Sequence, residues 1–229
     1  MRPIVQYIRV SLEDRMLLVG LTGGLASGKT TVAGLFQECG AFVIQADRLA
    51  RTVVTPGKTA WKEIVKTFGT HVLQADRTLD REALAKLVFQ RPRKLSELNC
   101  IVHPRVAREQ VRQTNAIARR HPNAVIIYDA ALLIEAQAHE RMDRVIVVTA
   151  NQPIQLQRAR QRDGLTKKEA LGRIRGQLPL RTKRRFADYI LNGTLPVTRL
   201  RSQVRQLYQE FLQEAVLPRR MRPGRPRHS

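Results

Sequence analysis

The residues with the clearest chemical meaning form a glycine-rich loop at positions 23–30. The loop reads Gly-Gly-Leu-Ala-Ser-Gly-Lys-Thr and fits the phosphate-loop pattern G-x-x-x-x-G-K-[ST], with an apolar stretch before it and a helical pattern after it. Glycines let the backbone bend so that successive N–H groups and the positive end of the next helix surround phosphate oxygens. The residues that we expect to contact a nucleotide are Gly23, Gly24, Leu25, Ala26, Ser27, Gly28, Lys29, Thr30 and Thr31.

Lys29 and Thr30 have different roles in this pattern. The ammonium group of Lys29 is expected to neutralise charge on the β- and γ-phosphates. The Thr30 hydroxyl is expected to bind Mg²⁺, because a hard divalent cation that bridges phosphate oxygens prefers oxygen ligands. The alternative is a glycine-rich turn with an unrelated lysine, which requires a chance match at every fixed position. The loop therefore predicts binding of a triphosphate with Mg²⁺.

An aspartate, Asp47, follows the apolar stretch 41–44. Ligands of parallel α/β sheets bind beyond the carboxyl ends of the strands, so Asp47 is a candidate for a substrate-facing residue. A carboxylate there can accept the proton of an attacking hydroxyl group and orient that group toward the γ-phosphate. Spacing alone supports equally well a helix N-cap, a position that Asp favours.

Three other polar residues are candidates from their positions. Asp129 ends the apolar stretch 124–128 and has the placement of an aspartate that holds Mg²⁺ through water, although a loop cap is the alternative. Glu135 follows Leu-Leu-Ile, and its spacing fits a surface residue as well as a functional one. His103 precedes Pro104 at a predicted helix start, where capping is its default role.

Arg158 and Arg162 are four residues apart on a predicted helix, so they share one face and repel each other unless an anion lies between them. Small kinases use such arginines on a mobile lid to stabilise the transferring phosphoryl group and to exclude water. A solvated basic face is the alternative.

The order of elements predicts an α/β fold with a parallel sheet. Apolar strand-like stretches alternate with helical patterns, which is typical of strands that are buried on both faces. The predicted strands are 17–21, 41–44, 124–128, 144–149 and 189–191. The predicted helices are 29–39, 81–89, 95–101, 105–120, 152–162, 167–177 and 200–214. Thr166 and Glu169 form a capping box at the start of the sixth of these helices.

We predict one folded domain at residues 16–215, between an unstructured N-terminal extension (1–15) and a basic disordered tail (216–229). Within this domain, a helical insertion spans about 80–121 and a lid spans about 151–178.

The formal net charge of +22 is compatible with a polyanionic partner. Nucleic acid is disfavoured because aromatic residues make up only 5% of the chain and do not cluster. No apolar run is long enough to span a membrane. Cys39 and Cys100 lie in apolar helical patterns without metal-site spacing and are predicted to be reduced core thiols, which favours the cytoplasm.

Several segments in this order resemble the dephospho-CoA kinase family over roughly residues 17–214. The resemblance is carried by the phosphate loop and by the motifs at 43–51, 79–81, 101–104, 132–135, 155–166, 173–177 and 187–192. It implies a P-loop NTPase three-layer sandwich with a helical substrate-binding insertion and a helical lid. It also implies ATP as donor, phosphorylation of the ribose 3'-hydroxyl of dephospho-CoA, and Mg²⁺ as cofactor.

The resemblance also implies roles for single residues. Asp47 is the expected base, and Arg158 and Arg162 belong to a closing lid. The residues expected to contact the acceptor substrate are Asp47, Arg51, His103 and Glu135. We expect a monomer or a weak homo-oligomer.

The sequence departs from the family at two positions. Gln45 stands where an acidic residue is usual, and Ala131 replaces a usual proline. The alternatives are another small P-loop kinase or, from a different class, a nucleic-acid-binding ATPase. A GTPase is disfavoured because the chain has no Asn-Lys-x-Asp motif.

Overall fold

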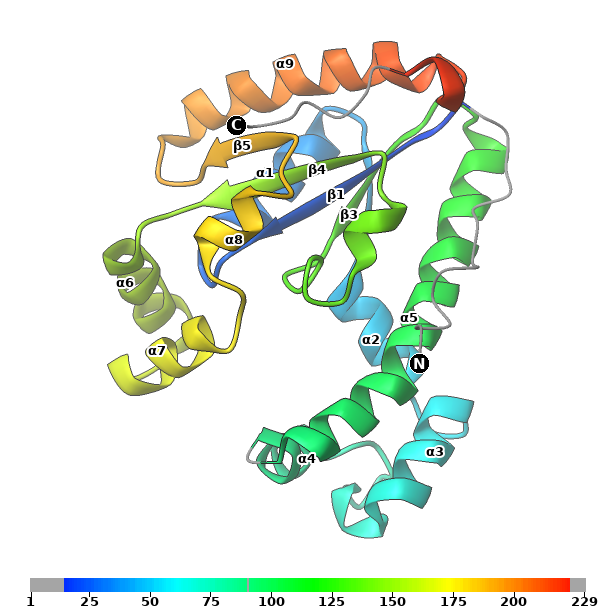
Figure 1. The fold of residues 1–229 in the computed structure, drawn as a ribbon, viewed down its shortest axis with the longest axis vertical. Helices are drawn as coiled ribbons and strands as arrows, with labels where there is room; N and C mark the ends of the chain where they lie inside the picture. Colours follow the sequence, from blue (N-terminus) through cyan, green and yellow to red (C-terminus); the bar gives the residue numbers. More distant parts are fainter. Residues whose placement is uncertain (1–14, 90, 223–229) are drawn as a thin grey trace. The chain divides into compact units, whose positions relative to one another are not determined.

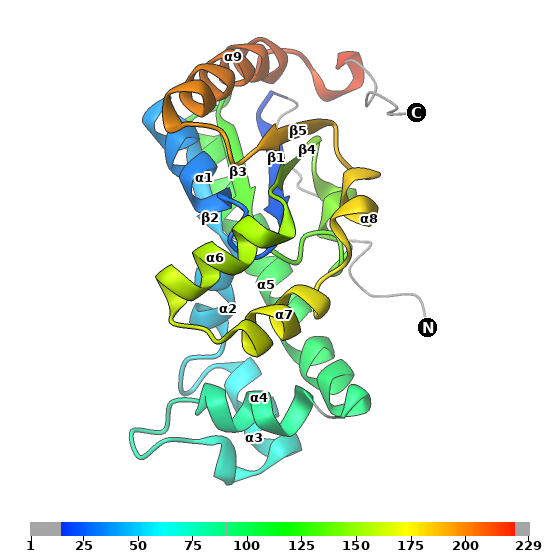
Figure 2. The same cartoon turned by 90° about the vertical axis from the view of Figure 1, so that its left-hand side faces the viewer.

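The computed structural model describes residues 15–89 and 91–222, and within them the chain forms two compact units (Figures 1 and 2). One unit contains residues 46–113. The other contains residues 15–45 and 114–222 and holds the sheet. Most of the predicted N-terminal extension and the last seven residues of the predicted tail lie outside the described residues.

A five-stranded parallel sheet forms the centre of the larger unit, with the strand order β2-β3-β1-β4-β5 in the described part of the chain. The strands are β1 (Leu17–Gly23), β2 (Phe42–Gln45), β3 (Val125–Asp129), β4 (Arg144–Thr149) and β5 (Tyr189–Asn192). All five predicted strands are confirmed. The sheet order places β1 between β3 and β4, so the phosphate loop leaves the middle of the sheet.

Both faces of the sheet are covered, which explains why its strands are apolar throughout. On one face, alternate residues of β1 (Leu17, Val19 and Leu21) pack in a cluster with α1 (Lys29–Glu38) and α9 (Val197–Ala215). On the other face, a Cβ atom at Gly20 would lie only 2.6 Å from Cδ2 of Leu133, so glycine allows the turn after β3 to pack closely. Figure 2 shows α1 and the short helix α8 (Leu180–Arg184) on opposite sides of the sheet. The predicted three-layer α/β fold is confirmed.

Two helices of the larger unit form the predicted lid segment. They are α6 (Gln152–Asp163) and α7 (Lys167–Arg175). The predicted capping box is present, because Thr166 Oγ1 accepts from the Glu169 N–H and the Glu169 carboxylate accepts from the Thr166 N–H. Sequence periodicity did not predict α8, which is only five residues long.

The smaller unit is helical, and its apolar cluster includes Ile64, Phe68, Leu84 and Ile101. Its helices are α2 (Ala46–Val53), α3 (Thr59–Phe68), α4 (Arg81–Phe89) and the first part of α5 (Pro92–Arg120). The helical region therefore begins at residue 46, whereas the sequence predicted that it begins at about residue 80.

A further difference concerns Pro104, which was predicted to begin a helix. It lies inside α5, so the two predicted helices 95–101 and 105–120 are one. Proline cannot donate the backbone hydrogen bond of its turn. At the next residue, Arg105 Nη1 donates to the Ile101 carbonyl oxygen at 2.6 Å, and the same guanidinium group pairs with Glu63.

The expectation that both cysteines are core thiols is wrong for one of them. Cys39 is half-buried, whereas Cys100 is exposed on α5. None of the helices described here has the length and apolar composition needed to cross a membrane.

Part of the predicted disordered tail is ordered and contacts the residues that precede β1 and β4. Residues 219–221 form a 3-10 helix after α9, and the Arg222 side chain is 5% exposed. Arg222 donates from Nη2 to the Met16 carbonyl oxygen at 2.7 Å and pairs through Nη1 with Asp143 Oδ2 at 3.1 Å. Asp143 Oδ2 also accepts from the Leu18 N–H at 2.8 Å. The arginine-rich composition suggested disorder, but the buried carboxylate of Asp143 supplies a partner for this segment.

We predict that Arg222→Ala lowers the free energy of unfolding by about 3 kcal/mol, because it leaves the buried Asp143 carboxylate with fewer compensating charges. Urea unfolding of purified protein measures this change. The matched control is Arg219→Ala, which removes a second partner of Asp143 whose side chain is 49% exposed. The control is expected to lower stability by less than about 1 kcal/mol. Equal losses in the two variants would contradict the prediction.

Candidate nucleotide and phosphate site

The phosphate loop lies between β1 and α1, as predicted. Gly28, the residue just before α1, has a φ of 96°, a left-handed conformation that favours glycine, and it caps α1 without a side-chain hydrogen bond. The first N–H groups of the helix therefore lack a side-chain partner and point beyond the helix end. Such an end attracts anions through these N–H groups and the helix dipole.

The loop is held against the segment that follows β5. An added Cβ atom at Gly193 would lie 1.8 Å from the Ser27 carbonyl oxygen, so only glycine allows this approach. Arg158 Nη1 donates to the Gly193 carbonyl oxygen at 2.9 Å and lies 3.5 Å from the Ala26 carbonyl oxygen. Ser27 is buried, and its hydroxyl oxygen has no hydrogen-bond partner among the described residues. The phosphate loop is thus contacted by the lid helix α6 and by the segment that follows β5.

Lys29 and Asp129 form an ion pair at the carboxyl ends of two neighbouring strands. Lys29 Nζ donates to Asp129 Oδ1, and both side chains are largely buried. The pair follows from the sheet, because Asp129 lies opposite Leu21 in the β1–β3 register. The structure therefore brings together the predicted phosphate-binding cation and the predicted metal-binding carboxylate, which are 100 residues apart in the sequence.

Arg158 and Arg162 line one cavity of about 430 Å³ together with residues of the phosphate loop. The other residues that line it are Ala26, Gly28, Thr31, Gln161, Gly193, Leu195, Val197 and Leu200. Arg162 also pairs with Asp163, with contacts of 2.8 and 2.9 Å, and this neighbour offsets the predicted repulsion. Hydrogen bonding to Asp163 raises the pKa of Arg162. Both arginines line this cavity, as expected for two residues on one face of α6, and their role toward a phosphate stays a prediction.

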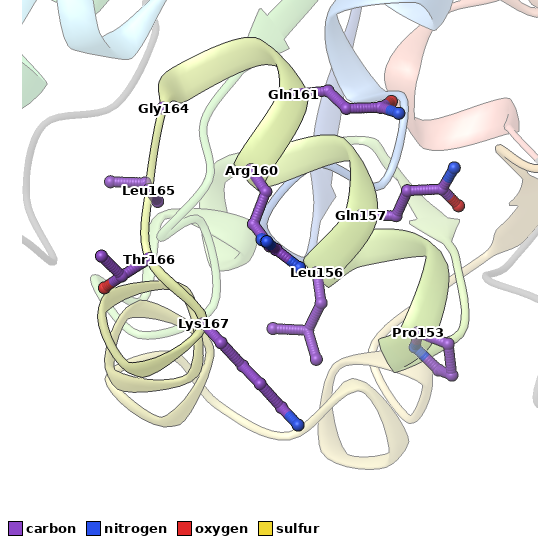
Figure 3. Close-up of a pocket in the computed structure, with 9 residues that line it drawn as sticks. All are labelled: Pro153, Leu156, Gln157, Arg160, Gln161, Gly164, Leu165, Thr166 and Lys167. Carbon is purple, nitrogen blue, oxygen red and sulfur yellow. The ribbon is translucent and has the colours of Figure 1, made fainter.

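A larger hollow, of about 780 Å³, lies between α6 and α7 (Figure 3). Pro153, Leu156, Arg160 and Lys167 line it, and it contains none of the predicted site residues. On a helix with 3.6 residues per turn, positions 153, 156 and 160 lie opposite positions 155, 158 and 162. We therefore take the smaller cavity beside the phosphate loop as the functional one.

The Glu135 carboxylate has partners within the protein. Its Oε1 atom accepts from the Leu178 N–H at 2.9 Å and lies 3.0 Å from Lys183 Nζ. Glu135 was predicted as a substrate-binding residue, and this role stays a prediction.

The remaining predicted residues belong to the helical unit of residues 46–113. Asp47 is exposed in the first turn of α2, which begins at Ala46, so the helix does not use Asp47 as its N-cap. Arg51 lines a hollow of about 550 Å³ within this unit, together with Leu79, Asp80 and Arg81. His103 is half-buried on α5 and does not line that hollow, and burial lowers the pKa of its imidazole group.

The comparison with known proteins agrees with this geometry. The family model described as Dephospho-CoA kinase matches residues 17–196. The chain belongs to the dephospho-CoA kinase family.

Individual family members cover most of the chain. A dephospho-CoA kinase of Moorella thermoacetica is 41% identical over 198 residues, which are 86% of this chain and 92% of the relative. A solved structure of the protein TT1252 from Thermus thermophilus has a TM-score of 0.74 and 30% identity and covers 86% of this chain and 98% of its own. Dephospho-CoA kinase from Campylobacter jejuni shares the fold, with a TM-score of 0.57 and 22% identity over 86% of this chain and 97% of its own.

Sequence reasoning missed two residues of the site, Gly193 and Lys183. Gly193 follows Asn192 directly after a strand, and an Asn-Gly pair is a turn signal that could have indicated it. Lys183 stands in an arginine-rich run, where composition indicates solvent exposure, yet its side chain is fully buried.

We predict that Gly193→Ala weakens ATP binding by at least tenfold, because a methyl group cannot fit beside the Ser27 carbonyl oxygen without moving the phosphate loop. Isothermal titration calorimetry with ATP measures the change. Gly172→Ala on α7 is the matched control, since a Cβ atom there meets no atom within 4 Å. Unchanged ATP affinity in Gly193→Ala would show that the close approach does not shape the loop.

We predict that His103 reduces stability in mildly acidic solution. Burial holds the pKa of its imidazole below the usual 6.5, so the unfolded chain binds a proton at a higher pH than the folded protein does. Stability is therefore present above pH 6.5 and is lost as the pH falls through the folded pKa. Urea unfolding at pH 8 and pH 5.5 should give a larger difference for wild type than for His103→Gln. An imidazole NMR signal that titrates at or above pH 6.5 would refute this.

Proposed function

We propose that this protein transfers the γ-phosphoryl group of ATP to the 3'-hydroxyl of the ribose of dephospho-CoA, giving coenzyme A and ADP. The observation that carries the proposal is the family match over residues 17–196, which contains the phosphate loop, Asp129 and the arginine-bearing helix α6. These residues account for donor binding in physical terms, and family membership indicates the acceptor.

The donor side rests on residues of the larger unit. The N–H groups at the start of α1 and the Lys29 ammonium group hold the β- and γ-phosphates. Arg158 and Arg162 face the same loop and stabilise charge that develops on the transferring phosphoryl group. Closure of the lid over this cavity excludes water that would otherwise hydrolyse ATP.

The side chains at the site fit Mg²⁺. This ion is usually held by one or two carboxylates, substrate phosphates and water, and Asp129 and Thr30 supply oxygen atoms of that kind. No cluster of three or more ionisable metal ligands occurs in the part of the chain that the structure describes. Thr30 and Asp129 would hold the ion, which would neutralise charge on the phosphate groups.

Asp47 is the proposed base. It follows β2 by two residues, and the last residue of β2, Gln45, lies opposite Asp129 in the sheet register. Its carboxylate accepts the proton of the ribose hydroxyl group as that oxygen attacks the γ-phosphorus atom. Arg51 and His103 are proposed to contact dephospho-CoA, and the hollow that Arg51 lines supports a ligand site in the helical unit. ATP as donor and reduced thiols support a cytoplasmic location.

The direct test incubates the protein with ATP, Mg²⁺ and dephospho-CoA and measures ADP and coenzyme A by chromatography. Adenosine and AMP serve as acceptor controls. ADP formation that depends on dephospho-CoA supports the proposal, and ADP formation with AMP instead favours another small P-loop kinase.

We predict that Asp47→Asn lowers kcat by roughly 10²–10⁴-fold, the usual contribution of a general base, while ATP binding and folding stay unchanged. Steady-state kinetics, calorimetry and circular dichroism measure the three properties. The matched control is Asp76→Asn, the same change at an exposed aspartate outside the proposed site. An Asp47→Asn enzyme with wild-type kcat would remove Asp47 from the role of base.

A further inference from the structure

The turn at residues 130–137, which follows β3, is anchored close to the reacting groups. The Ala131 carbonyl oxygen accepts from Thr22 Oγ1 at 3.1 Å and from Lys183 Nζ at 2.7 Å. Thr22 belongs to β1, just before the phosphate loop, and Ala131 is two residues from Asp129. The backbone that follows the proposed metal-binding carboxylate is therefore held from two directions.

The same turn is joined to the end of the lid segment. Glu135 Oε1 accepts from the Leu178 N–H at 2.9 Å, and Leu178 lies between α7 and α8, where the predicted lid ends. Lys183 Nζ lies 3.0 Å from the same carboxylate oxygen. One ammonium group thus contacts both anchor points of the turn, the Ala131 carbonyl oxygen and the Glu135 carboxylate.

Lys183 is an unusual residue for this position. Its side chain has no exposed surface, and a buried ammonium group is costly to dehydrate even when it is paired. Burial lowers the pKa of Lys183, the nearby charge of Lys29 acts in the same direction, and Glu135 opposes both. Because apolar residues in place of a buried ion pair are often neutral or stabilising, stability alone does not account for this pair. An apolar pair would not supply the hydrogen bonds that Lys183 makes to the turn and that Glu135 makes to Leu178.

We propose that Lys183 and Glu135 are positioning residues, which fix the turn after Asp129 to the end of the lid and so hold the metal-binding carboxylate in place while the lid moves. Neither residue touches the reacting atoms in this role. Glu135 then acts through Lys183 and Leu178 in place of the substrate contact expected from the sequence. The catalytic part of the proposal rests on the proposed kinase activity.

The first experiment separates positioning from stability. Lys183→Met leaves the Glu135 carboxylate without its cation and should lower the thermal unfolding midpoint. The double variant Lys183→Met/Glu135→Leu removes both charges and should recover most of that midpoint. In both variants kcat should stay at least tenfold low, and the Mg²⁺ concentration for half-maximal rate should rise about tenfold, because the segment that carries Asp129 loses its support.

The matched control is Arg184→Met, which makes the same change at the next residue of α8, where the side chain is exposed. It should leave kcat and the Mg²⁺ dependence at wild-type values. If the double variant regains wild-type kcat and Mg²⁺ dependence together with its stability, the pair is only structural and the proposal is wrong.

The second experiment needs no turnover. Hydrogen–deuterium exchange followed by mass spectrometry reports the Leu178 N–H through peptides that span residues 176–182. Glu135→Leu removes the acceptor and should raise exchange in these peptides at least fivefold, whereas Glu135→Gln keeps an oxygen acceptor and should raise it less. Unchanged exchange in Glu135→Leu would overturn the anchoring of the lid. If wild type shows this anchoring but does not phosphorylate dephospho-CoA, the proposed function fails and the anchoring remains.

Discussion

The parallel pairing of β1 with β3 is the constraint on which the site depends. Because neighbouring parallel strands end at the same edge, Lys29 after β1 and Asp129 at the end of β3 meet although 100 residues separate them. At this edge, the Lys29 ammonium group and the N-terminus of α1 attract the negative charge of a phosphate chain. The Asp129 carboxylate attracts a divalent cation. The lid and the segment after β5 then position Arg158 and Gly193 against the same loop.

The sequence predicted the parts of the site that depend on local pattern. The phosphate loop, its flanking strand and helix, and the shared face of Arg158 and Arg162 all follow from spacing over a few residues. Lys183 and Arg222 could not be predicted in the same way, because their partners lie 52 and 206 residues away. Composition was misleading for both, since arginine-rich segments usually lie in solvent. Pro104 was misplaced because a proline weakens a helix without always ending it, and α5 continues through this position.

The basic residues that give the chain its strong positive charge have two different roles in the structure. Arg219 and Arg222 neutralise Asp143, and Arg144 pairs with Glu214 nearby, at the end of the sheet remote from the phosphate loop. Burial raises the pKa of Glu214, and the adjacent arginines oppose that shift. At the other end, Lys29, Arg158 and Arg162 face the site. Part of the basic composition is therefore structural, and another part serves to hold anions.

Buried ion pairs at the two ends of the sheet differ in what they connect. The pair of Arg222 with Asp143 joins the segment after α9 to the start of β1, remote from the phosphate loop, so its loss should appear as lost stability. The pair of Lys183 with Glu135 joins a turn beside Asp129 to the boundary of a lid that closes over ATP in the proposed reaction. In the proposed role, a fixed point at that boundary keeps the Asp129 carboxylate in place when α6 and α7 move. The cost of dehydrating Lys183 is opposed by its contacts with Glu135 and the Ala131 carbonyl oxygen.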